Sequence, residues 1–85
     1  MGTYQVHIRV MPRPALLDPQ GQAVEHALAA LGFGEVGAVR MGKALTVSLK
    51  APSPEAAGER ARAMCRSLLA NPVTEDFEVA VGSAT

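Results

Sequence analysis

The fold of this 85-residue chain depends on one stretch, VGAVRMGKALTVSLK at residues 36–50. Apolar and polar residues alternate along it, which is the pattern of a strand with one buried face. A two-residue turn at Gly42-Lys43 would divide the stretch into a hairpin, but Gly-Lys is a weaker turn signal than Asn-Gly or Asp-Gly. Without the turn, one face carries five apolar side chains: Val39, Met41, Leu45, Val47 and Leu49. The pattern favours one long, bent strand, with the hairpin as the alternative.

A strand and a helix are predicted before this stretch. Residues 4–10 alternate between apolar and polar, which predicts a half-buried strand that ends at Pro12. Asp18 is a suitable helix N-cap, Pro19 is tolerated at the first helical position, and Gly32 suits a left-handed C-cap. The apolar stripe of this helix consists of Ala23, Val24, Ala27, Leu28 and Leu31.

A second helix and a last strand are predicted after residues 36–50. Ser53 caps this helix, Pro54 opens it, and Pro72 stops it because the residue before a proline avoids the helical region. Alternation over residues 77–81 predicts the strand. The apolar stripe of the helix consists of Ala57, Ala61, Met64, Cys65, Leu68 and Leu69.

Two helices with one apolar stripe each need a sheet face to bury against. We therefore expect an α+β fold, a two-layer sandwich with both helices packed on one face of a mainly antiparallel sheet. If residues 36–50 form a hairpin, the order is βα(ββ)αβ, which is ferredoxin-like. A chain of this length suffices for one domain, expected over residues 1–85.

The composition excludes several classes of partner. Eight Lys plus Arg balance eight Asp plus Glu, so the net charge is zero. Nucleic acids and anionic membranes attract a clustered positive excess, and we expect neither as a partner. No apolar run approaches the ~20 residues that span a bilayer. The alternating N-terminal segment does not resemble a signal peptide, so a cytoplasmic location is expected.

No catalytic, cofactor-binding or metal-binding residue is predicted. Residues 37–44, GAVRMGKA, have the spacing of a phosphate-binding P-loop, but Ala44 stands where that motif needs Ser or Thr to bind Mg²⁺. His7 and His26 have no partner at metal-ligand spacing. Cys65 lies in an apolar stripe, which favours a buried, unreactive thiol.

Three sequence blocks resemble the PurS family, the small subunits of phosphoribosylformylglycinamidine synthase. The first is LDPQG at residues 17–21, followed by AV at 23–24 and HAL at 26–28, and the second is VRMGK at residues 39–43. The third is Cys65 with LLANPV at residues 68–73 and EDF at residues 75–77. Each block alone is a weak signal, whereas three in the right order are specific. The departures are Thr74, where the family usually has an aliphatic residue, and a short tail.

The resemblance implies a non-catalytic accessory subunit of de novo purine biosynthesis. The complete enzyme is a glutamine-dependent, ATP-consuming C–N ligase. The small subunit would bridge a glutaminase subunit and a large synthetase subunit and aid the transfer of ammonia between them. ATP and Mg²⁺ would belong to the synthetase subunit, and no cofactor to this chain.

The matched blocks also give candidate subunit contacts, chosen as polar or backbone-special positions: Asp18, Gln20, Gly21, Arg40, Lys43 and Asn71. The alternative for these residues is a local structural or solvated role. A homodimer is expected because a strand of about fifteen residues would reach roughly 50 Å and pair with a second copy. Two such dimers could pair as a tetramer.

Two other functions stay open on the sequence. One is a small-molecule-sensing regulatory domain of ferredoxin-like topology. The other is a small stand-alone enzyme such as an acylphosphatase, although Pro12 and Pro14 lack the N–H groups of a phosphate cradle.

Overall fold

Three strands form one antiparallel sheet in the computed structural model, which describes residues 1–83. The strands are β1 (Gly2–Pro12), β2 (Lys43–Ala51) and β3 (Glu75–Ser83). β1 lies in the middle, in the order β2-β1-β3, and Val6 pairs with Val47 on one side and Val81 on the other. Alternate residues of each strand therefore share one face, as predicted for β1 and β3.

The helices begin where their capping residues predict. α1 (Pro19–Ala30) is capped by Asp18, and α2 (Pro54–Met64) by Ser53, whose hydroxyl accepts a hydrogen bond from the Ala56 N–H at 3.1 Å. α2 continues into a π-helical turn, η1 (Cys65–Leu69). Gly32, after α1, has a φ of 101°, the left-handed conformation expected of a glycine that ends a helix.

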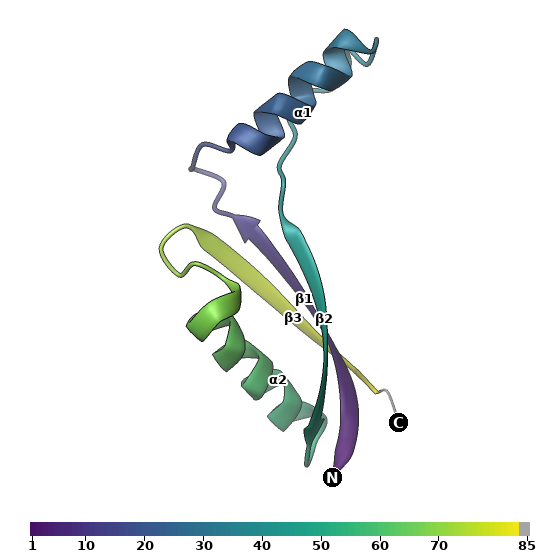
Figure 1. Cartoon of the computed structure of the whole chain (residues 1–85), viewed down its shortest axis with the longest axis vertical. Coiled ribbons are helices and arrows are strands. Elements are labelled where there is room, and N and C mark those ends of the chain that lie inside the picture. Colours follow the sequence, from purple (N-terminus) through teal and green to yellow (C-terminus); the bar gives the residue numbers. More distant parts are fainter. Residues whose placement is uncertain (84–85) are drawn as a thin grey trace.

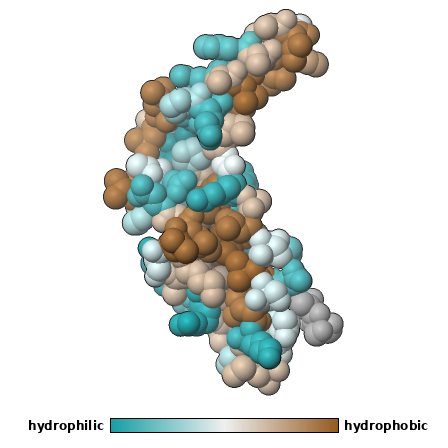
Figure 2. Space-filling view, viewed as in Figure 1, coloured by the Kyte–Doolittle hydropathy of each residue, from teal (hydrophilic) through white to brown (hydrophobic). Residues whose placement is uncertain are grey.

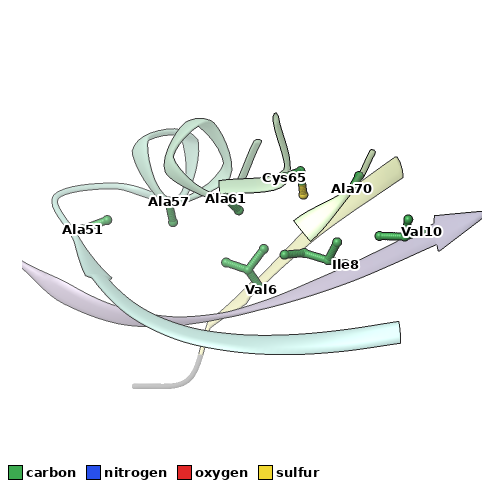
Figure 3. Packing of buried hydrophobic residues seen from close by; sticks show 8 residues of the cluster. All are labelled: Val6, Ile8, Val10, Ala51, Ala57, Ala61, Cys65 and Ala70. Atoms are coloured by element: carbon green, nitrogen blue, oxygen red, sulfur yellow. The ribbon is translucent and has the colours of Figure 1, made fainter. Parts of the chain in front are cut away.

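The core lies between one sheet face and the helical segment formed by α2 and η1 (Figure 3). Its buried members are Val6, Ile8, Val10, Ala51, Ala57, Ala61, Cys65 and Ala70. Four of these eight are alanines, and two of them, Ala57 and Ala61, lie on α2. Their small side chains let α2 approach the sheet closely but bury little apolar area. One helical segment therefore covers the sheet with a thin core.

The first helix does not lie where the sequence predicts it. α1 projects beyond the end of the sheet instead of covering its face (Figure 1). The chain measures 51 × 27 × 14 Å and its radius of gyration is 16.4 Å, whereas a compact chain of this length has about 12 Å. The α+β class and the antiparallel sheet are confirmed, but in this single chain only the second helix packs on the sheet.

Residues 36–50 form neither a hairpin nor one long strand. β2 begins only at Lys43, which pairs with Val10, and residues 36–42 run outside the sheet toward α1. The Met41 N–H cannot join a strand ladder because it donates to the Asp18 carboxylate. Pro12, at the end of β1, has no N–H to offer. The expected strand over residues 36–50 is thus wrong in its first half.

Candidate subunit-interaction site

A hydrogen-bonded neck, formed by residues 12–18 and 39–42, joins α1 to the sheet. Asp18 lies at its centre and is 8% exposed. Its Oδ1 accepts a hydrogen bond from the Gly21 N–H at 2.9 Å, and its Oδ2 accepts one from the Met41 N–H at 2.7 Å. One carboxylate therefore caps the helix and fixes the returning chain against it.

The neck also favours the ionised form of this carboxylate. The hydrogen bond from Met41, and then the one from Gly21, lower the pKa of Asp18 below its ordinary value, with a smaller contribution from the Arg40 guanidinium. Partial burial acts in the opposite direction and is outweighed. Asp18 is therefore negatively charged at neutral pH.

Gly21 lets the two chain segments of the neck approach each other. It is buried in the first turn of α1, and a Cβ at this position would collide with the carbonyl oxygen of Val39. Only glycine fits here without displacing the backbone of residue 39. The first and second sequence blocks are thus complementary surfaces of one contact.

Arg40 closes the neck from its outer side. Its Nη1 donates to the Leu16 carbonyl at 3.0 Å, and its Nη2 donates to the Arg13 carbonyl at 2.8 Å. A longer contact, 3.5 Å, reaches the Pro12 carbonyl. The planar guanidinium therefore holds the connector from β1 in a fixed shape.

The third block is connected to the neck through Arg13, which the sequence reasoning did not select. The Arg13 N–H donates to the Thr74 carbonyl at 2.9 Å, and its side chain donates to the Pro72 carbonyl at 2.7 Å. Its Nε also lies 3.3 Å from an oxygen of Asp76. The only signal in the sequence is an arginine between two prolines, where a fixed backbone can aim a long side chain.

Asn71 organises the turn that Arg13 contacts. Its side-chain oxygen accepts a hydrogen bond from the Val73 N–H at 3.0 Å, and its own N–H donates to the Glu75 carboxylate at 2.7 Å. Gln20 on α1 and Lys43 at the start of β2 are exposed. The structure therefore places Asp18, Gly21 and Arg40 together, connects the turn at Asn71 to them through Arg13, and leaves Gln20 and Lys43 exposed.

Two apolar surfaces lie open on either side of the neck (Figure 2). The first, called here the α1 stripe, comprises Val24 and Leu28, which are half-buried, and Leu31, which is 74% exposed. The second, called here the open groove, lies between β2 and the α2–η1 segment, and Leu68 on its rim is 82% exposed. The groove is lined by Val47, Arg60, Ala63, Met64, Ser67, Leu68 and Leu69. Exposed apolar surfaces of this kind are typical of protein-protein contacts.

Two further findings concern metal-ligating and thiol side chains in the described part of the chain. No group of three His, Cys, Asp or Glu side chains is close enough in this part of the chain to hold a metal ion. Cys65 is buried, and burial raises the pKa of its thiol against the smaller opposing effect of Arg66. In the same range, no helix is both long and apolar enough to cross a bilayer.

Proteins of known sequence match this chain over most of its length. The family model for PurS, described as phosphoribosylformylglycinamidine (FGAM) synthase, matches residues 5–83. The chain is 41% identical over 75 residues to the PurS subunit of Synechocystis, covering 88% of this chain and 75% of the relative. The Bacillus subtilis PurS subunit is 38% identical over 92% of each chain.

Solved structures agree with these sequence matches. The Methanocaldococcus jannaschii PurS structure superposes with a TM-score of 0.86 at 30% identity, covering 96% of this chain and 99% of the other. A chain in the structure of PurLQS from Thermotoga maritima gives a TM-score of 0.87 at 32% identity, covering 96% of this chain and 100% of that one. The chain therefore belongs to the PurS family and is a subunit of phosphoribosylformylglycinamidine synthase, a glutamine-dependent ligase of purine biosynthesis.

Proposed function

We propose that this chain is the bridging subunit of its enzyme, joining a glutaminase subunit to a large synthetase subunit and aiding the transfer of ammonia between them. ATP and Mg²⁺ are assigned to the synthetase subunit, and this chain acts in the cytoplasm as one domain over residues 1–85. The Thermotoga maritima PurLQS structure, which contains a chain of this fold, supports the proposal. The observation that carries it is the neck, which holds α1 off its own sheet and leaves two apolar surfaces available to other molecules.

We further propose that the chain forms a homodimer, which can pair into a tetramer. The accessible surface of the single chain is 5736 Å², whereas a compact protein of this mass exposes about 4,800 Å². The excess is roughly 1,000 Å², close to the ~800 Å² that each partner buries in a standard interface. The expected argument for the dimer was a long strand over residues 36–50, but residues 36–42 are not part of the sheet. The support for the dimer is therefore this excess of accessible surface.

The six candidate contact residues separate into two roles within this proposal. Asp18, Gly21 and Arg40 keep the neck rigid, and Asn71 shapes the turn before β3. Gln20 and Lys43 are exposed and contact a partner subunit directly. The neck residues therefore act on assembly through the position of α1.

Reconstitution with the two large subunits tests the bridging role. The isolated chain is expected to have no glutaminase, synthetase or ATPase activity. Adding it to the large subunits should restore glutamine-dependent synthesis, whereas synthesis from added ammonium should depend on it much less. The bridging role is wrong if the large subunits use glutamine equally well without this chain.

A further inference from the structure

The part of the chain that projects from the sheet is acidic (Figure 1). It comprises residues 14–39, called here the arm, and contains three carboxylates, Asp18, Glu25 and Glu35, but no Lys or Arg. The rest of the chain contains all eight Lys and Arg and the other five carboxylates. The net charge of zero is therefore the sum of a charge of −3 on the arm and +3 on the remainder.

A hollow of about 420 Å³ opens at the base of the arm. The connector from β1, the first turns of α1 and the returning segment before β2 surround it. This neck hollow is lined by Ala15, Leu16, Leu17, Asp18, Gln22, Glu25, Ala38, Val39 and Arg40. None of these residues belongs to the α1 stripe or lines the open groove, so the neck hollow is a separate surface.

Glu25 supplies the excess negative charge of the neck hollow. Asp18 and Arg40 carry opposite charges, and both bond to backbone groups of the neck. Glu25 is half-buried, and none of the side-chain hydrogen bonds and ion pairs described for residues 1–83 involves it. Partial removal of a carboxylate from water costs free energy unless a counter-charge is near. A cation from another molecule would offset this cost.

Leu16 and Leu17 give the same hollow an apolar wall. Leu17 is 72% exposed and Leu16 is 39% exposed, and neither belongs to the core. The neck uses the backbone carbonyl of Leu16, which accepts from Arg40, and leaves both leucine side chains at the surface. Lys and Arg combine an apolar stem with a charged end. A hollow with exposed leucines and a carboxylate matches both parts of such a side chain.

We infer that the neck hollow binds a Lys or Arg side chain on a basic surface of one of the two large subunits. The inference rests on the bridging role proposed above. The stem of that side chain packs against Leu16 and Leu17, and its charged end binds the Glu25 carboxylate. Gln22 also lines the hollow, and its side-chain oxygen is a second acceptor. The charge of −3 on the arm attracts a basic surface before contact.

The separation of charge also gives the bridge a direction. The long axis of the chain measures 51 Å, several times the Debye length of ~10 Å at 0.1 M salt. The arm and the far end of the sheet therefore act on partners as separate charges. Two copies of this chain, each of zero net charge, have no overall attraction of this kind, whereas a basic surface of a large subunit is attracted to the arm.

Two variants test the neck hollow, and each has a matched control. Glu25→Lys reverses the charge in the hollow, whereas Glu35→Lys makes the same change elsewhere on the arm. Leu17→Ser removes apolar surface from the hollow, whereas Val73→Ser does so outside it at a residue that is 74% exposed. In titration calorimetry, each hollow variant should raise the dissociation constant for one large subunit by about tenfold or more. Each control should change it by at most about threefold.

Salt dependence tests the ionic part of the contact. Raising the salt concentration from about 0.1 M to about 1 M shortens the Debye length from ~10 Å to ~3 Å. The dissociation constant of the wild type should therefore rise with salt, and that of Glu25→Gln should rise less. Circular dichroism and light scattering of each variant check that the fold and the self-association are kept.

Photochemical cross-linking identifies the occupant of the hollow. A photoreactive maleimide attached to Leu17→Cys should cross-link to a peptide of a large subunit that contains Lys or Arg. The same label on Val73→Cys should give far less of this product. Native Cys65 is buried and takes up little label. A product that joins Leu17→Cys only to a second copy of this chain would overturn the inference.

The binding measurements separate this inference from the bridging role on which it rests. If the wild type binds a large subunit and the two hollow variants bind it equally well, the assignment of the neck hollow is wrong and the bridging role stands. If the wild type binds neither large subunit, the bridging role itself is wrong and the assignment fails with it.

Discussion

Asp18 and Met41 lie 23 positions apart in the chain, yet the carboxylate of one accepts a hydrogen bond of 2.7 Å from the N–H of the other. This bond joins the start of α1 to the segment that leads into β2. It withdraws the Met41 N–H from any strand ladder, which explains why β2 begins only after this bond, at Lys43. One side chain thus separates the part of the chain that forms a sheet from the part that projects.

The depressed pKa of Asp18 predicts how the neck responds to acid. A carboxylate whose pKa is lower in the folded than in the unfolded chain stabilises the folded state at any pH above its ordinary pKa, which is 3.8 for Asp18. This stabilisation is lost as the pH falls through the lower pKa of the folded state. Asp18→Asn should therefore lower the stability at pH 7 and flatten the dependence of stability on pH below about pH 4. Urea unfolding between pH 2 and pH 7 measures both effects. Glu78→Gln, at an exposed position on β3, is the control, and an unchanged pH profile for Asp18→Asn would contradict this role.

The close approach of the Val39 carbonyl to Gly21 leaves no room for a side chain at position 21. A methyl group at this position would collide with the Val39 carbonyl oxygen, so Gly21→Ala should destabilise the chain by about 1–3 kcal/mol. Gly34→Ala is the matched control, because a Cβ there meets no atom within 4 Å and its effect should stay within about 0.5 kcal/mol. Urea unfolding of both variants tests the difference. Equal stabilities would show that the backbone of residue 39 yields at no cost.

We expect the thiol of Cys65 to react only after the chain unfolds. Its side chain is fully buried in the core and burial raises its pKa, so the reactive thiolate is scarce in the folded chain. Alkylation by iodoacetamide at pH 8 should be much slower than for a free cysteine peptide, and urea should bring it to the peptide rate. A native chain that reacts at the peptide rate would show that the helical segment opens readily.

The local elements could be predicted from the sequence because their signals are short-range. Asp18-Pro19 and Ser53-Pro54 cap helices where expected, and alternation correctly identified the faces of β1 and β3. The position of α1 could not be predicted in this way. Helical periodicity shows which residues of α1 are apolar, but it does not show which molecule covers them.

The candidate site was predictable in its members and not in its connections. Asp18, Gly21 and Arg40 were selected as separate residues, and their convergence depends on the course of residues 36–42, where the strand prediction was wrong. Arg13 was missed because its partners are backbone carbonyls, which leave no pattern in the side chains. Periodicity and motif spacing therefore cannot predict hydrogen bonds to main-chain groups that lie far away in the sequence.

Lys43 and Arg40 lie three residues apart and should respond differently to charge reversal. Lys43 is exposed and none of the described side-chain hydrogen bonds or ion pairs involves it, so Lys43→Glu should change the free energy of unfolding by at most about 0.5 kcal/mol. If Lys43 contacts a large subunit, the same change should weaken binding to that subunit. Arg40→Glu should lower stability as well as binding, because it removes the bonds to the Leu16 and Arg13 carbonyls. Urea unfolding together with titration calorimetry against each large subunit separates the two effects, and unchanged affinity of Lys43→Glu for both subunits would remove Lys43 from the interface.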